Sequence, residues 1–226
     1  MAKRELPFSK RDIISLDITG ITHSGYGIGR SGGLAVFVPG AVPGDSIRAE
    51  VTGLKGNYAT ARLLDITGPS PLRREPRCTF FLSCGGCRLQ NVDYAGQLRL
   101  KTGLVRDSLS RIAGLGGAVV NDTIGMDDPW HYRNKAQCQV IESRGALRLG
   151  FFSEGSHRPG AFLGEGGGQC LLVDRDLSQT APVVERLLNK YKKGTGGNGG
   201  KPFFRHVILR KGAAGQIMAV IVTAPG

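Results

Sequence analysis

Apolar and polar residues alternate over much of the first 66 residues. The stretches IISLDITG (13–20) and SIRAEVT (46–52) are apolar at every second position, and LAVFV (34–38) and YATARLLDI (58–66) are rich in strand-forming residues. A period of two, punctuated by glycine and proline, is typical of short antiparallel strands. The pattern therefore predicts a small barrel of roughly four strands.

Farther along the chain, apolar residues recur with the spacing that is typical of α-helices. A first helix is expected from about residue 94 to 113, with an apolar face formed by Leu98, Val105, Leu109 and Ile112. Asp93 is its expected cap and Gly114 its end. A second helix is expected over residues 180–193, with Thr180 as N-cap and Pro182 in the first turn. Residues 131–153 and 203–223 are predicted to form two hairpins.

One glycine-rich stretch matches a nucleotide-binding motif without its context. GIGRSG, residues 27–32, satisfies G-x-G-x-x-G, but the strand-like LAVFVPG follows it. A dinucleotide loop must open a helix whose N-terminus holds the pyrophosphate. We therefore assign these glycines to tight turns of the barrel.

Composition restricts where the protein works. The chain has 226 residues, five of them cysteines, and its longest apolar stretches are far shorter than the ~20 residues of a membrane span. The N-terminal MAKRELPFSK is basic, with no apolar segment behind it, so no signal peptide is indicated. We expect a cytoplasmic, monomeric protein with reduced thiols and no membrane partner.

The charge of the chain indicates its partner. The formal net charge is +12, and the excess is concentrated in residues 71–113, with 8 basic and 3 acidic groups, and 179–226, with 8 and 1. Such an excess suggests a polyanion, and nucleic acid is the commonest one in the cytoplasm.

Three cysteines lie within ten residues. CTFFLSCGGC places Cys78, Cys84 and Cys87 in the spacing C-x5-C-x2-C, with two glycines between the last two. Four thiolates complete either a tetrahedral zinc site or a [4Fe–4S] cluster. Three clustered ligands and one remote ligand favour the cluster over a zinc ribbon. The fourth ligand is Cys138 or Cys170, and the glycine-rich loop before Cys170 favours Cys170, whereas Cys138 lies in a predicted strand.

Several of these segments together resemble a known enzyme family. CTFFLSCGGCRLQNVDYAGQLRLKTGLVRDSLSRIAGL, HYRNKAQCQV, LGFFSEGSH, QCLL and FFRHVILRKG follow one another as in the S-adenosylmethionine-dependent 23S ribosomal RNA (uracil-5-)-methyltransferases that carry an iron–sulfur cluster. The resemblance implies an OB-like, RNA-binding TRAM domain at the N-terminus. It also implies four cluster ligands, which are Cys78, Cys84, Cys87 and Cys170. The polar side chains of HYRNKAQ are expected RNA contacts, namely Arg133, Asn134, Lys135 and Gln137.

The resemblance also implies a fold, an organisation and an activity. We expect a mixed β and α+β chain: a TRAM barrel at 10–67, a linker and cluster loop at 68–92, and a central α+β RNA-binding domain at 93–226. The implied activity is methyl transfer from S-adenosylmethionine to C5 of a uridine, with 23S rRNA as partner. The residues contain no unit typical of a Rossmann-like methyltransferase domain. We therefore expect that domain to be absent, no catalytic or S-adenosylmethionine-binding residue here, and a chain inactive alone. The alternative is a stand-alone RNA-binding module with a structural metal site.

Overall fold

The computed structural model describes residues 7–156, 158–163, 170–192 and 203–225. The chain forms two compact units. The first comprises Met1–Arg77 and Arg88–Gly125, and the second comprises Cys78–Cys87 and Met126–Gly226. The cysteine-rich segment therefore belongs to the second unit, together with Cys170.

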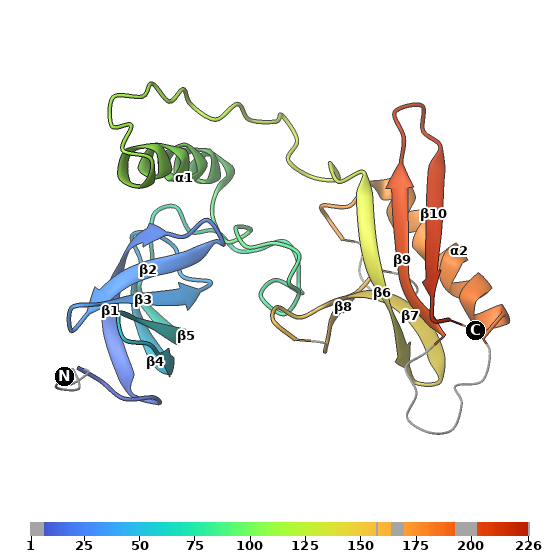
Figure 1. Ribbon diagram of the computed structural model, residues 1–226, viewed down its shortest axis with the longest axis horizontal. Helices are drawn as coiled ribbons and strands as arrows, with labels where there is room; N and C mark the ends of the chain where they lie inside the picture. The colour runs from blue at the N-terminus through green and yellow to red at the C-terminus, as the bar shows by residue number, and fades with distance from the viewer. Residues whose placement is uncertain (1–6, 157, 164–169, 193–202, 226) are drawn as a thin grey trace. The chain divides into compact units, whose positions relative to one another are not determined.

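The first unit contains a closed five-stranded barrel (Figure 1). Its strands are β1 (Ile13–Ile21), β2 (Tyr26–Ser31), β3 (Leu34–Pro39), β4 (Ser46–Leu54) and β5 (Tyr58–Gly68). The order around the barrel is β1-β2-β3-β5-β4, and pairing of β1 with β4 closes it. Side chains at alternate positions fill the interior, including Ile18, Val36, Val38, Ile47, Ala49 and Val51.

Strand β2 corrects one expectation from the sequence. GIGRSG lies largely within this strand rather than in tight turns, so the barrel has one strand more than predicted. A side chain at Gly29 would lie 2.6 Å from the carbonyl oxygen of Asp17, and one at Gly27 would lie 2.8 Å from that of Ala41. These glycines therefore allow β2 to approach its neighbours closely.

Helix α1 (Tyr94–Asp107) follows in the same unit and is capped as predicted. The Asp93 carboxylate accepts a hydrogen bond from the Gly96 N–H at 2.7 Å. The α-helix ends earlier than expected and continues as a single π-helical turn, Ser108–Ile112. Val105 and Ile112, placed on the predicted apolar face, are 52% and 85% exposed. Among the described residues, no helix is both long enough and apolar enough to cross a membrane.

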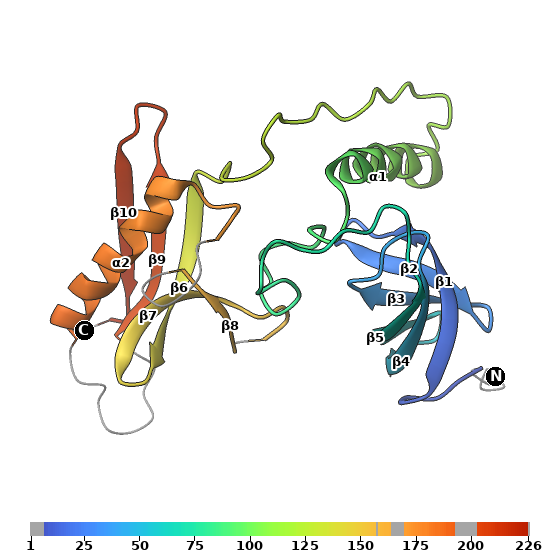
Figure 2. The same ribbon diagram turned by 180° about the vertical axis from the view of Figure 1, so that it is seen from behind.

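The second unit is a five-stranded antiparallel sheet with a helix across one face (Figure 2). The strands are β6 (Lys135–Ser143), β7 (Ala146–Phe152), β8 (Pro159–Phe162), β9 (Phe204–Lys211) and β10 (Ile217–Thr223), in the order β10-β9-β6-β7-β8. Both predicted hairpins are present, as β6–β7 and β9–β10. Apolar residues of α2 (Arg175–Lys190) pack on the inner sheet face, among them Leu177, Ala181, Val184 and Leu188.

Helix α2 begins five residues before the position expected from the sequence. Its N-cap is Asp174, whose side chain accepts a hydrogen bond from the Asp176 N–H at 2.9 Å. Thr180 is therefore inside the helix, and its hydroxyl donates to the Asp176 carbonyl at 2.7 Å. Pro182 is also interior, where its ring removes one helical hydrogen bond. The expectation was wrong because proline was taken as the start of the helix.

The helix also satisfies backbone groups of β7. The Asn189 side chain accepts from the Leu147 N–H and donates to the Leu147 carbonyl, both at 2.8 Å. The buried Glu185 carboxylate accepts from the Leu149 N–H at 2.6 Å. These bonds satisfy backbone groups of β7 at positions that the short strand β8 does not cover. This part of the β7 edge is therefore not left without hydrogen-bond partners.

Candidate functional site

The cysteine-rich segment of the second unit is a compact series of turns. The Phe81 N–H donates to the Cys78 carbonyl at 3.1 Å, and the Cys84 N–H donates to the Phe80 carbonyl at 2.8 Å. The Gly85 N–H then donates to the Phe152 carbonyl at the end of β7, at 3.2 Å. The segment is thus folded on itself and attached to the sheet.

The two glycines of this segment lie close to neighbouring atoms. A side chain at Gly85 would lie 3.3 Å from the Phe152 carbonyl oxygen, which is tight, whereas one at Gly86 would lie in ordinary contact with the Cys84 sulfur, at 3.4 Å. The N–H of Gly86 also hydrogen-bonds to the Cys84 sulfur. Backbone N–H groups directed at thiolates stabilise the negative charge of a metal–sulfur centre.

A second segment brings Cys170 to the same part of the unit. The His131 N–H donates to the Leu171 carbonyl and the Arg133 N–H to the Leu172 carbonyl, both at 2.8 Å. The Asp174 N–H donates back to the Arg133 carbonyl at 2.9 Å. The residues just before β6 therefore hold the chain that follows Cys170. Residues 164–169, the glycine-rich loop before it, lie outside the described residues.

Arg133 connects these two segments. Its backbone pairs with the strand-like residues after Cys170, and its guanidinium donates to the Gly86 carbonyl at 2.8 Å. The sequence predicts this side chain as an RNA contact. In the structure it is directed at the turn between Cys84 and Cys87, a placement that no spacing in the sequence indicates.

The thiols interact electrostatically. Burial raises the pKa of the Cys84 thiol, and the nearby Cys170 and Cys78 raise it further, while the Gly86 N–H and the Arg133 guanidinium act in the opposite direction. Cys170 and Cys78 are thus each close enough to Cys84 to affect its pKa, and all five cysteines are free thiols. Within the described ranges, no three histidine, cysteine or acidic side chains converge as a ready-made metal site. The four thiols are the ligand type that a thiolate-bound cluster requires, but their sulfur atoms are not already arranged around one point.

Cys138 has a different environment from the other candidate for fourth ligand. It is fully buried in the core between the sheet and α2, whereas Cys170 is partly exposed at the edge of that core. Burial, with a smaller contribution from Cys170 and Glu185, raises the pKa of Cys138 to about 12. In this position Cys138 acts as a small apolar residue.

The other predicted RNA contacts lie on or beside the sheet face opposite α2. Asn134, Lys135 and Gln137 are all exposed. Lys135 is directly opposite Arg210 of β9, which the sequence did not suggest as a functional residue because strand register cannot be read from composition. Neither cation has a carboxylate partner among the described residues. By contrast, Lys211, on the other face, pairs with Asp174 at 3.0 Å and Asp176 at 2.7 Å.

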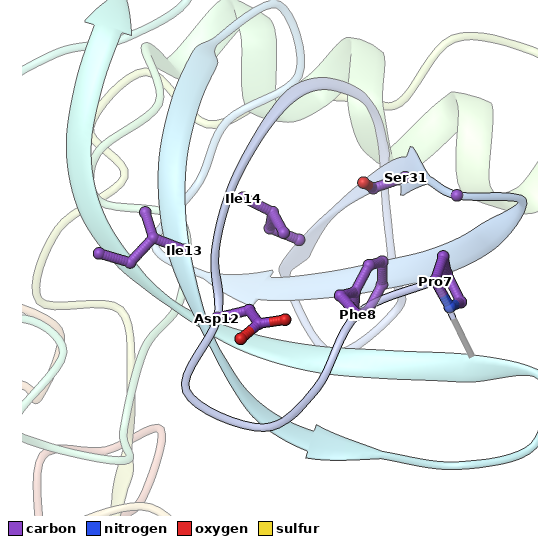
Figure 3. Close-up of a pocket in the computed structure, with 7 residues that line it drawn as sticks. Pro7, Phe8, Asp12, Ile13, Ile14 and Ser31 are labelled. Atoms are coloured by element: carbon purple, nitrogen blue, oxygen red, sulfur yellow. The ribbon is translucent and has the colours of Figure 1, made fainter. Parts of the chain in front are cut away.

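A cavity of about 470 Å³ opens at one end of the barrel (Figure 3). Its lining combines apolar side chains, among them Pro7, Phe8, Ile13 and Ile14, with the polar residues Asp12 and Ser31. The charged group among the described lining residues is Asp12, whose carboxylate accepts from the Ser9 N–H at 2.8 Å and so closes a local turn.

Comparison with known proteins identifies the barrel as a TRAM domain and relates the whole chain to RNA methyltransferases. The TRAM domain model matches residues 7–64. Uncharacterized RNA methyltransferases of Halalkalibacterium halodurans and Clostridium acetobutylicum are 36% and 34% identical over 225 residues, 99% and 98% of this chain. One from Listeria innocua is 37% identical over 95% of the chain. The chain spans about half the length of these relatives, 46–48%.

A solved structure has a similar fold. It is the Pyrococcus abyssi tRNA (uracil-54, C5)-methyltransferase in complex with S-adenosyl-L-homocysteine, with a TM-score of 0.63 and 22% identity. The match covers 93% of this chain and 46% of that one. The chain thus contains a TRAM domain and is homologous to RNA methyltransferases.

These comparisons correct two expectations. We expected the chain to lack the catalytic methyltransferase domain and to be inactive alone. Proteins named RNA methyltransferases instead align with 99% of the chain, and the solved methyltransferase covers 93% of it. Both expectations rested on a missing sequence pattern, the strand–glycine-loop–helix unit, and the second also on the assignment of four of the five cysteines to the cluster. The absence of this pattern is not evidence that the chain differs from the RNA methyltransferases with which nearly all of it aligns.

Proposed function

We propose that the protein acts in the methylation of C5 of a uridine in 23S rRNA, with S-adenosylmethionine as methyl donor. The observation that carries this proposal is the alignment of nearly the whole chain with proteins named RNA methyltransferases. The TRAM domain adds an RNA-binding module, and the cysteine pattern is the feature shared with the cluster-carrying 23S rRNA enzymes.

The electrostatics of the second unit support an RNA ligand. Like charges directly opposite one another on neighbouring strands are destabilising, yet Lys135 and Arg210 occupy such a pair on an exposed face. A phosphate between the two cations would remove their repulsion. Gln137, two residues along the same face, adds an amide able to hydrogen-bond to base edges.

The proposed cluster would be held by Cys78, Cys84, Cys87 and Cys170. The contacts that support this set are those that bring the Cys84–Cys87 turn and the Cys170 segment together through Arg133. A [4Fe–4S] centre bound there would join two distant parts of the chain covalently through metal–sulfur bonds. The structural consequence for this chain is a fixed surface beside β6, where the exposed RNA-contact residues begin.

The chemistry explains why RNA must be positioned. C5 of uracil is a poor nucleophile, so enzymes of the family that the sequence resembles first add a thiolate at C6, which is covalent catalysis. S-adenosylmethionine supplies an electrophilic methyl group when bound. The target base must also leave its stack, at a cost of a few kcal/mol. Contacts from the barrel and from Lys135 would hold the RNA strand during this step.

The proposal is tested by methyl transfer with the natural gene product. The protein is incubated with labelled S-adenosylmethionine and either unmodified 23S rRNA or unmodified tRNA, and 5-methyluridine is identified by mass spectrometry. We expect 5-methyluridine in 23S rRNA. Product in tRNA alone would replace the proposed substrate by that of the Pyrococcus abyssi enzyme. No methylated uridine in either RNA would contradict the proposed activity.

A further inference from the structure

Two aromatic rings meet on the outer surface of the barrel. Val36 and Val38 point into the core, so Phe37 between them points outward, and buried Ala59 places the neighbouring Tyr58 outward as well. The two rings are in edge-to-face contact, with centroids 5.5 Å apart and an interplanar angle of 64°. Both side chains remain partly exposed.

Strand register extends this aromatic surface across three strands. Ile28 of β2 lies opposite Phe37, and it too points outward between the buried Gly27 and Gly29. β3 in turn pairs with β5 where Ala35 lies opposite Tyr58. We call the surface formed by Ile28, Phe37 and Tyr58 the aromatic strip.

Cations border the aromatic strip. Arg30 of β2 is exposed and lies opposite Ala35 of β3, and Ala35 in turn lies opposite Tyr58 of β5. Lys55 is in the β4–β5 turn, and its N–H donates to the Tyr58 carbonyl at 2.9 Å. At the other end of β2, the guanidinium of Arg88 lies 5.7 Å from the centre of the Tyr26 ring.

The charges near the aromatic strip differ from those elsewhere on the barrel. On β4 and β5, Arg48 pairs with Asp65 at 3.2 Å, and Arg62 pairs with Glu50. Arg30 and Lys55 have no carboxylate partner in the described part of the chain. The outer barrel surface is therefore neutralised over β4 and β5 but positive beside the exposed rings.

We propose that the aromatic strip binds unpaired bases of single-stranded RNA, with Arg30 and Lys55 on the phosphates. Aromatic rings beside unpaired cations are the combination that binds single strands, because every base can stack and every nucleotide carries a phosphate. OB-like barrels offer such a surface on strands β2 and β3 and on the β4–β5 loop. This inference rests on the proposed function only in taking RNA as the ligand, and it assigns the contact to particular residues.

The test measures binding of the full chain to a fluorescent ten-nucleotide oligouridine and to a duplex RNA of equal length. Phe37→Leu and Tyr58→Leu keep an apolar side chain but remove the ring. We expect each to weaken oligouridine binding about tenfold with an unchanged salt slope, since stacking is lost and no charge is removed. Arg30→Gln should instead lower the salt slope by about 0.7.

Arg48→Gln is the matched control, because it removes one cation from the same barrel but away from the aromatic strip. It should leave both the affinity for oligouridine and the salt slope close to those of the unaltered chain. Thermal melting shows whether each variant is folded, and Tyr58→Phe, which keeps a ring, should bind normally. If the unaltered chain binds RNA but Phe37→Leu and folded Tyr58→Leu bind equally well, the aromatic strip is excluded and the proposed function stands. If the unaltered chain binds neither RNA, both are contradicted.

Discussion

At the scale of single residues, Asp45 is a fully buried charged group of the first unit. Its side chain has no exposed surface, and its carboxylate accepts from the Val42 N–H at 2.7 Å, the Ser70 N–H at 2.8 Å and the guanidinium of Arg73. These bonds join the turn before β4 to the linker that leaves the barrel. A buried carboxylate with a complete set of donors is stabilising only while all of its partners remain.

We expect Asp45→Asn to lower the free energy of unfolding by about 2–3 kcal/mol, because Arg73 loses its charge partner in a nearly buried site. Urea denaturation followed by circular dichroism measures this. Asp65→Asn is the control, since Asp65 and Arg48 are 57% and 49% exposed, and such pairs contribute only up to about 1 kcal/mol. Equal losses in the two variants would contradict this role of Asp45.

The same carboxylate predicts a pH dependence. Burial by itself raises the pKa of Asp45, but hydrogen bonds from Arg73, Ser70 and Val42 outweigh it and hold the pKa below its usual value of 3.8. A pKa that is lower in the folded state contributes stability that is complete above the unfolded value. This contribution should be lost as the pH falls below about 4, through the folded pKa. In Asp45→Asn, the free energy of unfolding should therefore change less with pH over this acidic range.

Arg133 is the second residue with a specific expectation, and this one rests on the proposed cluster. If its guanidinium positions the Cys84–Cys87 turn, Arg133→Ala should lose iron about tenfold faster during anaerobic dialysis, as is typical when a partner of metal ligands is removed. The visible absorbance of the cluster reports the loss without any activity measurement. Lys135→Ala removes the same charge from an exposed position nearby and should not change the rate. Equal rates for Arg133→Ala and the unaltered chain would exclude the positioning role.

At the scale of elements, strands with alternating apolar residues were predictable, as was the Asp93 cap of α1, whereas β2 and the start of α2 were not. Strict alternation in IISLDITG and SIRAEVT predicted β1 and β4, because side chains of a barrel strand point alternately inward and outward. Strand β2 was missed because its inward positions are glycines, which give no hydrophobic pattern. The Arg133–Gly86 contact was missed for a different reason. It joins residues 47 positions apart, and only the folded sheet brings them together.

Helix α2 carries an element-scale prediction. Pro182 lies inside the helix, and proline in a helix interior costs about 3 kcal/mol. We expect Pro182→Ala to raise the free energy of unfolding of the second unit by roughly 1–3 kcal/mol, because it restores the hydrogen bond to the Ser178 carbonyl. Thermal denaturation tests this. A lower melting temperature would show that the helix requires the proline.

At the scale of the whole molecule, charge excess alone does not identify the binding surfaces. Part of it is neutralised internally, as in the Lys211 pairs with Asp174 and Asp176. The cations that remain unpaired are the informative ones. In the second unit these include Lys135 and Arg210, which lie opposite each other on the exposed sheet face.

Lys135→Ala and Arg210→Ala should therefore each lower the salt slope of single-stranded RNA binding by about 0.7, since each removes one phosphate contact. Fluorescence anisotropy across a salt series measures the slope. Lys211→Ala, which removes a cation already neutralised by two carboxylates, should change it less. A larger effect for Lys211→Ala than for Lys135→Ala would place the RNA on the opposite face.

Whether Cys78, Cys84, Cys87 and Cys170 hold one [4Fe–4S] cluster is tested most directly by iron and sulfide analysis of anaerobically purified protein. We predict brown protein with about four iron and four sulfide per chain. Cys170→Ser should abolish or weaken the cluster, whereas Cys138→Ser, buried in the core, should retain it. Colourless protein with one stoichiometric zinc, or loss of iron in Cys138→Ser but not in Cys170→Ser, would contradict the proposed site.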